Sequence, residues 1–179
     1  MKLIYIRHGE TDWNTLHLLQ GSTDIPLNET GRLQAQKTAQ ILSTQPFQRI
    51  FCSPLLRAKE TAQIINQTRN VPLTCDDRIR ERGFGSLEGK PFTQKDFDQW
   101  WKSNFNGTLY GMESIDELRT RVSSLLDELC LLFPEETILM VAHGGTFVAV
   151  DSYFNGYPSD GETLRFIPNC TFKIFESQK

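Results

Sequence analysis

The sequence predicts an α/β sandwich built on a mostly parallel sheet, and two observations predict it. Short apolar segments alternate with segments of helical periodicity along the chain, as in proteins built from βα units. The segment 137–142 is apolar almost throughout, as expected of a strand covered on both faces. A chain of 179 residues can bury roughly 70% of its unfolded surface in one core. No repeat or linker-like tract divides it, so we expect one domain over residues 1–179.

The first predicted unit is a strand followed by a helix. The segment 3–6 is short and apolar, which favours a buried strand. Apolar residues recur near helical spacing over 31–45, and either Asn28 or Thr30 is available to cap that helix.

The second unit repeats this pattern. A strand is predicted at 49–52, and Ser53-Pro54 is expected to open a helix that continues to about Gln67. Serine caps free amide groups, and proline tolerates the first helical turn. The segment 71–75 contains a proline and is therefore a short edge strand at best.

The second half of the chain begins with the clearest helix signal. Ser114 and Glu117 have the spacing of a capping box. The apolar stripe that follows contains Ile115, Leu118, Val122, Leu125, Leu126 and Leu129. A strand at 137–142, a helix at 147–154 and a final strand at 172–175 complete the prediction.

Composition excludes several classes of protein. With 22 acidic and 19 basic residues the net charge is −3, which gives no overall attraction to nucleic acid or anionic lipid. An apolar content of 39% argues against a disordered chain. The four cysteines form no Cys-x-x-Cys pair, so we expect reduced thiols and no metal site. The apolar stretch at 3–6 is too short for a signal peptide or membrane span, and a cytoplasmic location is expected.

Two of the three histidines share one predicted environment. His8 follows the first predicted strand, beside Gly9, which allows close approach of a ligand. His143 follows the strand at 137–142. Ligands of parallel sheets bind beyond the carboxyl ends of the strands. A lone histidine is more often structural than catalytic, but this pairing favours a functional site.

Two arginines point to an anionic ligand. Arg7 precedes His8, and Arg57 lies in the first turn of its predicted helix, where the helix dipole disfavours a cation. Either a salt bridge to Glu10 or Glu60, or a bound anion, would compensate. Two arginines can grip phosphate oxygens, and two imidazoles can act as nucleophile, acid or donors. The implied ligand is a phosphoryl group.

Glu81 lies in a glycine-bearing loop after the third predicted strand. A carboxyl group near the phosphate could protonate a leaving alkoxide. The alternative is that Glu81 only pairs with Arg78, Arg80 or Arg82.

In their order along the chain, these motifs resemble the histidine phosphatase superfamily, also called the phosphoglycerate mutase-like family. The similar motifs are Arg7-His8-Gly9-Glu10-Thr11 with Asn14 and Gln20-Gly21, Asp24 to Asn28 with Gly31, Ser53 to Ala62, Glu81 with Phe84-Gly85 and Glu88-Gly89, Glu113-Ser114, and Ala142-His143-Gly144-Gly145. The resemblance covers most of the chain and is nearest to the short phosphatase branch, which includes alpha-ribazole and broad-specificity phosphatases. It implies a three-layer α/β/α sandwich.

The resemblance also implies roles for the candidate residues. His8 would be the nucleophile that becomes phosphorylated. Arg7, Arg57 and His143 would hold the phosphoryl oxygens and stabilise the transition state. Glu81 would be the general acid and then the general base. His8 must be neutral to attack whereas a protonated His143 would help to neutralise phosphate, so a bell-shaped pH profile is expected.

Further binding residues follow from the same resemblance. Asn14 and Gly144 would add contacts to the phosphate, and Gln20 and Gly21 would contact the substrate. No cofactor or metal is implied. The expected partner is a small phosphorylated metabolite rather than nucleic acid or membrane, and a homodimer remains open. Neither the residues nor the resemblance selects the metabolite.

Three functions share these motifs: a phosphatase, a cofactor-dependent phosphoglycerate mutase, and a noncatalytic phosphate or phosphoprotein binding module. Gly83 stands where the mutase signature has histidine, and 90–110 contains no arginine to grip a carboxylate. The phosphatase is therefore favoured over the mutase. The presence of both His8 and Glu81 argues against the binding module.

A segment at about 83–111 is expected to cover the pocket. It carries the aromatic residues Phe92, Phe97, Trp100, Trp101, Phe105 and Tyr110. They either contact an organic leaving group or anchor a short helix to the core, and we favour anchoring because aromatic clusters usually mean burial. His17 is assigned no role.

Overall fold

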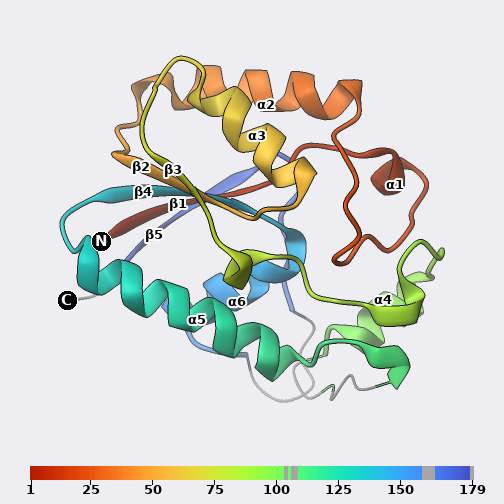
Figure 1. The fold of residues 1–179 in the computed structure, drawn as a ribbon. Helices are drawn as coiled ribbons and strands as arrows, with labels where there is room; N and C mark the ends of the chain where they lie inside the picture. The colour runs from red at the N-terminus through yellow and green to blue at the C-terminus, as the bar shows by residue number, and fades with distance from the viewer. Residues whose placement is uncertain (103–104, 106–108, 159–163, 178–179) are drawn as a thin grey trace.

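The computed structural model describes residues 1–102, 105, 109–158 and 164–177. Its five-stranded sheet has the order β3-β2-β4-β1-β5 (Figure 1). The strands are β1 (Lys2–Arg7), β2 (Arg49–Cys52), β3 (Leu73–Cys75), β4 (Thr137–Ala142) and β5 (Phe172–Glu176). The α-helices are α1 (Asp12–Thr15), α2 (Glu29–Ile41), α3 (Leu56–Asn66), α4 (Gln94–Trp100), α5 (Ile115–Leu132) and α6 (Gly144–Asn155).

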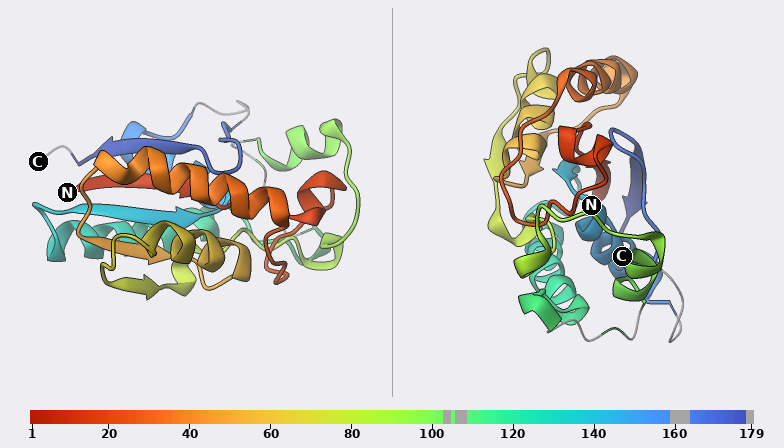
Figure 2. Two further views of the ribbon diagram at one scale, coloured as in Figure 1. Left: turned by 90° about the horizontal axis from the view of Figure 1, so that it is seen from above. Right: turned by 90° about the vertical axis from the view of Figure 1, so that its right-hand side faces the viewer.

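The sheet is the middle of three layers. Strands β1 to β4 pair in parallel, and β5 pairs antiparallel with β1. Helices α2 and α3 lie over one face, and α5 and α6 lie under the other (Figures 1 and 2). The predicted three-layer α/β/α sandwich with a mostly parallel sheet is therefore confirmed. The carboxyl ends of β1, β2 and β4 meet at one edge of the sheet, on the side of α1 and α4 (Figure 1).

The core is divided by the sheet because successive residues of a strand point to opposite faces. Leu3 and Tyr5 belong to the cluster that includes the buried side chains of α5 and α6. Ile4 and Ile6 belong to the cluster on the side of α3. Complete burial of such a side chain stabilises the fold by about 1.5–3 kcal/mol. Alternate side chains of β1 therefore anchor the strand to the helix layers on both faces of the sheet.

Two helix caps predicted from the sequence are confirmed. The Ser114 Oγ accepts a hydrogen bond from the Glu117 amide at 3.1 Å, and the Ser114 amide donates to the Glu117 carboxylate at 2.8 Å. At the start of α2, the Asn28 side chain accepts from the Gly31 amide at 2.8 Å, so Asn28 rather than Thr30 is the cap.

Two helix starts differ from the prediction. Helix α3 begins at Leu56, and its amide donates to the Asp24 carboxylate at 2.6 Å. The Ser53 Oγ accepts from the Leu55 amide, at 3.3 Å, one residue before the helix, so the acceptor for the first helical amide comes from a residue distant in sequence and not from the predicted cap. Helix α6 begins at Gly144, before the apolar pattern that starts at Phe147. None of the helices in the described part of the chain combines the length and apolar character needed to cross a bilayer.

Candidate active site

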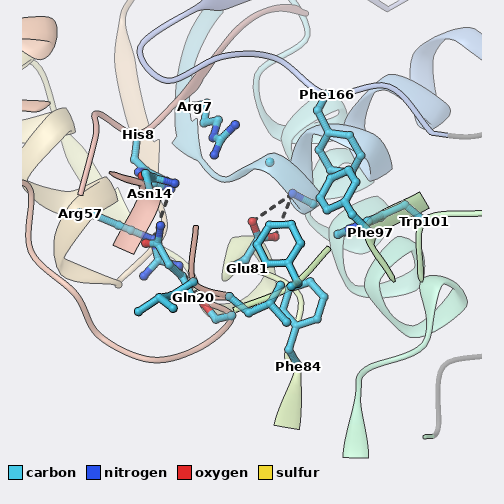
Figure 3. A pocket seen from close by; sticks show the side chains of 16 residues that line it. Arg7, His8, Asn14, Gln20, Arg57, Glu81, Phe84, Phe97, Trp101 and Phe166 are labelled. Carbon is cyan, nitrogen blue, oxygen red and sulfur yellow. Dashed lines mark hydrogen bonds between the residues drawn. The ribbon is translucent and has the colours of Figure 1, made fainter. Parts of the chain in front are cut away.

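The candidate residues meet at the carboxyl edge of the sheet. Arg7 ends β1 and His8 follows it, while His143 follows β4 and caps α6. The two imidazole rings are 5.2 Å apart, centroid to centroid. Arg57 enters from the first turn of α3, and Glu81 from the loop after β3. Figure 3 shows Arg7, His8, Arg57 and Glu81 around one pocket.

This pocket has a volume of about 140 Å³. The predicted site residues that line it are Arg7, His8, Asn14, Gln20, Gly21, Arg57, Glu81 and Gly144. His143 is fully buried against His8 and is not part of the lining. The structure thus brings together all the residues that the sequence singled out, although their roles remain predictions.

His8 is held in one tautomer by its neighbours. Its Nδ1 lies 2.7 Å from the Gly9 carbonyl oxygen, and an oxygen of this kind can only accept, so Nδ1 carries the proton. The opposite nitrogen, Nε2, accepts from the Arg57 Nε at 3.3 Å. An unprotonated Nε2 is the form of imidazole that can attack phosphorus.

Gly9 has a different role from the one expected. A Cβ atom on Gly9 would lie 2.5 Å from the Gly31 carbonyl oxygen, so the glycine permits close packing of two backbones rather than approach of a ligand. The Gly9 amide donates to the Thr61 Oγ1 at 3.0 Å. These contacts fasten the residue after His8 to the start of α2 and the middle of α3.

Arg57 is held by main-chain oxygens and not by a carboxylate. Its Nη1 donates to the Thr23 carbonyl at 2.9 Å and its Nη2 to the Gly21 carbonyl at 2.8 Å. The salt bridge to Glu10 or Glu60 that the sequence left open is absent from the described residues. Burial lowers the pKa of Arg57 to about 10, so the guanidinium remains charged at neutral pH. Its charge is therefore available to an anion in the pocket.

Arg7 supplies a second cation. Its Nη1 donates to the Ile167 carbonyl at 2.9 Å, while its Nε is buried with no hydrogen-bond partner. Burial lowers the pKa of Arg7 below its ordinary value, and the nearby Glu81 carboxylate opposes that shift. A buried donor without a partner is costly unless a ligand satisfies it. An oxygen atom of a bound phosphoryl group would do so.

Glu81 faces the pocket rather than the neighbouring arginines. Both of its carboxylate oxygens accept from the Gly145 amide, at 2.9 and 3.0 Å (Figure 3). Arg78 pairs instead with Asp76 and Glu128, Arg80 with Asp77, and the Arg82 guanidinium donates to main-chain carbonyls. The alternative of a purely structural ion pair is therefore wrong for this carboxylate. Glu81 rests at the positive end of α6.

Gly145 is the contact point on which this placement depends. A Cβ atom there would lie 2.3 Å from the Glu81 Oε1 and 2.6 Å from the Trp101 ring. We expect Gly145→Ala to displace Glu81 and to lower kcat by about tenfold or more, since small displacements of a reacting group are costly. Steady-state kinetics check this. Gly83→Ala is the matched control, because its Cβ would meet no atom closer than 3.9 Å; equal activity of the two variants would contradict the prediction.

Both imidazoles are neutral in this pocket. Burial, with the charges of Arg57 and Arg7, lowers the pKa of His8 well below 6.5. Burial, with the charges of Arg57 and Arg7, likewise lowers the pKa of His143 well below 6.5. Neutral His8 fits the expected nucleophile. The protonated His143 expected for phosphate binding is not the form that this pocket favours before an anion arrives.

These shifts make stability depend on pH in a defined direction. A histidine whose pKa falls on folding binds fewer protons when folded, so stability is complete above the unfolded pKa near 6.5 and is lost below it. With two such histidines, the free energy of unfolding should fall by up to about 2.7 kcal/mol for each pH unit below pH 6.5. Urea unfolding between pH 7.5 and 5.5 measures this slope. His8→Gln/His143→Gln should flatten the slope; an unchanged slope in the double variant would count against the shifts.

The other predicted contacts are placed as follows. The Asn14 Oδ1 accepts from the Thr11 amide at 3.1 Å, which orients the side-chain amide at the pocket wall. The Oε1 of Gln20 is buried without a partner, so it is available to a ligand donor. Gly21 lines the pocket, and its carbonyl supports Arg57. Gly144 lies at the first position of α6 and also lines the pocket.

An apolar wall completes the pocket, and sequence reasoning missed three of its members, Leu18, Leu19 and Phe166. It consists of Leu18, Leu19, Phe84, Phe92, Phe97, Trp101 and Phe166 (Figure 3 labels four of them). Phe84 belongs to a recognised motif, but no sequence signal connects Phe166 with the site. In the aromatic segment, Trp100 and Trp101 are buried in the core, as favoured, and Phe97 and Trp101 also line the pocket; contact of these rings with an organic leaving group stays a prediction. Tyr110 is exposed.

Among the described residues, no cluster of three or more histidine, cysteine or carboxylate side chains could hold a metal ion. The donors in the pocket are guanidinium and amide groups, which suit an anion.

Comparison with known proteins agrees with this geometry. The profile of the histidine phosphatase superfamily (branch 1) matches residues 3–179. The chain is 35% identical over 170 residues to the uncharacterized phosphatase PhoE of Bacillus subtilis, covering 94% of this chain and 85% of that protein. It is 33% identical over 186 residues to the probable phosphoglycerate mutase GpmB of Yersinia enterocolitica, and this match covers 100% of this chain and 86% of that protein.

A solved structure gives the same result. Mycobacterial glucosyl-3-phosphoglycerate phosphatase in complex with VO3 superposes with a TM-score of 0.85 and 28% identity, covering 97% of this chain and 90% of that one. The profile match and these similarities extend over nearly the whole chain and include every candidate residue. The protein therefore belongs to branch 1 of the histidine phosphatase superfamily.

Proposed function

We propose that the protein is a metal-independent phosphatase that hydrolyses a small phosphorylated metabolite in the cytoplasm through a phosphohistidine on His8. One observation carries the proposal: the unprotonated Nε2 of a buried His8 shares a pocket with two guanidinium groups and a carboxyl group. Arg7 and Arg57 match the charge of a phosphoryl group. Glu81 supplies the acid and base that an ester hydrolysis needs.

In the first step, the His8 Nε2 attacks phosphorus, the N–P bond forms, and the P–O bond to the organic group breaks. Arg7 and Arg57 stabilise the negative charge on the transferring oxygens. The arrival of that charge favours a proton on the nearby His143, which then adds a further donor. Glu81 donates its proton to the departing oxygen, so the organic product leaves as an alcohol.

In the second step, a water molecule replaces the organic product. Glu81, now a carboxylate, accepts a proton from this water while its oxygen attacks phosphorus. The N–P bond breaks, His8 recovers its lone pair, and inorganic phosphate is released. Every group returns to its starting form.

The lining of the pocket favours an apolar or aromatic organic group. Outside the phosphate end, the described lining consists of the apolar wall and the Gln20 amide, with no further cation. Of the residues that the structure does not describe, only Lys179 is basic. A substrate carboxylate would be desolvated here without a partner, which is costly. We therefore expect higher kcat/KM for aryl and apolar phosphomonoesters than for 3-phosphoglycerate or phosphoserine.

A phosphoglycerate mutase is the second candidate, because GpmB is among the similar proteins. A mutase must hold the carboxylate of a phosphoglycerate while the phosphoryl group returns to a different oxygen. The missing cation in the described lining disfavours this reaction.

The test follows two products in parallel in the presence of a chelator. Inorganic phosphate is measured for a panel of phosphomonoesters, and 3-phosphoglycerate is assayed for isomerisation with added bisphosphoglycerate. We expect phosphate release without isomerisation and no effect of the chelator. Isomerisation without net phosphate release would establish the mutase, and inactivity in both assays would favour a phosphate-binding module.

A further inference from the structure

Arg82 is a buried cation that the proposed reaction does not use. Its side chain is completely buried, and burial lowers its pKa to about 10, so it remains charged at neutral pH. Within the described residues its guanidinium makes no salt bridge. Its Nε donates to the Glu113 carbonyl and its Nη1 to the Trp100 carbonyl, both at 2.8 Å, while Nη2 is buried without a partner. Burying a charge in this way is costly.

The two carbonyls that hold Arg82 lie on either side of the segment 101–112 in the sequence. Trp100 is the last residue of α4, and Glu113 immediately precedes the Ser114 cap of α5. One guanidinium group thus joins both ends of the segment 101–112. It also lies 4.8 Å from the centroid of the Trp101 ring, within the range of a cation–π contact.

Trp101 and Glu81 both pack closely against the Cα of Gly145, in the space that a side chain there would occupy. The Trp101 ring and the Glu81 Oε1 lie 2.6 and 2.3 Å from the place where a Cβ on Gly145 would be. The Arg82 amide also donates to the Glu81 Oε1 at 2.8 Å. The carboxyl group is therefore enclosed between the main chain of Arg82 and the ring that its guanidinium supports.

We propose that Arg82 is a positioning residue that fixes Trp101, and through it the Glu81 carboxyl group, at the pocket. The inference rests on the proposed function of Glu81. Without the guanidinium, the two ends of the segment lose their common donor and Trp101 loses its support. Glu81 then shifts relative to the leaving oxygen. Proton transfer should suffer, whereas the attack by His8, on the other side of the pocket, should persist.

Arg82→Met tests this because methionine keeps an apolar stem and removes the charge and the donors. The burst of p-nitrophenol from p-nitrophenyl phosphate reports attack by His8, since that leaving group needs little protonation. The kcat for an alkyl phosphate reports proton transfer. We expect kcat for the alkyl phosphate to fall by about 10- to 100-fold, with little change in KM and in the burst rate. Arg82→Lys should be intermediate, because lysine keeps the charge and loses the planar fork.

Leu129→Ala controls for lost stability. Leu129 is buried in α5 away from the pocket lining, so its variant should lower Tm without changing the ratio of alkyl to aryl activity. Equal losses on both substrates in Arg82→Met, or the same altered ratio in Leu129→Ala, would overturn the proposal. If Arg82→Met does not fold, Arg82→Lys carries the comparison.

Hydrogen exchange separates this inference from the proposed function. The Gly145 amide is protected by Glu81 in this structure. We expect its exchange to accelerate in Arg82→Lys or Arg82→Met relative to Leu129→Ala, even if the wild type releases no phosphate. Unchanged exchange would reject the positioning role of Arg82, and an inactive wild type would reject the phosphatase alone.

Discussion

A His8→Ala variant is expected to lose phosphatase turnover by about 10⁴-fold or more, because removal of a nucleophile disables the groups that act with it. Steady-state phosphate release measures the loss. Acid- and base-quenched reactions with labelled substrate measure the intermediate, since phosphohistidine is labile to acid and stable to base.

His17→Asn is the matched control for this variant. His17 is exposed and has a positive φ of 53°, which asparagine tolerates better than alanine does. It should retain wild-type turnover and the labelled intermediate. Near-normal turnover in a folded His8→Ala protein would reject His8 as the nucleophile and leave the phosphohistidine mechanism without support.

Glu81→Gln is expected to show a loss that depends on the leaving group. Glutamine keeps the size of the side chain and an oxygen that can accept from the Gly145 amide, but it cannot donate an acidic proton. The kcat for an alkyl phosphate should fall by about 10²- to 10⁴-fold, the usual contribution of general acid–base catalysis. With p-nitrophenyl phosphate, attack should continue and hydrolysis of the intermediate should slow. A burst of one equivalent of p-nitrophenol should therefore precede slow turnover.

Glu136→Gln provides the comparison for this burst. Glu136 lies just before β4, at the end of the sheet opposite the pocket, and pairs with Arg49. The Glu136→Gln variant should therefore hydrolyse both substrates at the wild-type rate. Rapid-quench kinetics on the two substrates decide the outcome. If Glu81→Gln slowed the attack step equally for alkyl and aryl phosphates, the general-acid assignment would fail. The role of Glu81 would then be structural, as the acceptor for an amide in the first turn of α6.

The fold could be predicted where the decisive interactions are local. Apolar alternation in β1 and the stripe of α5 determine which side chains enter the core, and both patterns are visible over a few residues. The cap of α5 is predictable because Ser114 and Glu117 are one turn apart. The start of α3 is not, because the acceptor for its first amide is Asp24.

The same distinction applies to the candidate site. His8 and His143 could be placed near each other because parallel strands bring their carboxyl ends to one edge. The partners of Arg57 could not be predicted in this way. Its position in the sequence suggests Glu10 or Glu60, whereas the fold brings the carbonyls of Gly21 and Thr23 to its guanidinium group.

The α/β class, the family and the identity of the residues that meet at the sheet edge could all be read from the amino-acid sequence. These features depend on short-range periodicity and on motifs that follow individual strands. Three contacts emerge only on folding: Glu81 accepts from the Gly145 amide, Phe166 joins the apolar wall, and Arg82 binds the carbonyls of both Trp100 and Glu113. Each of these contacts joins residues far apart in the chain, and their geometry is fixed only when the layers pack and exclude water.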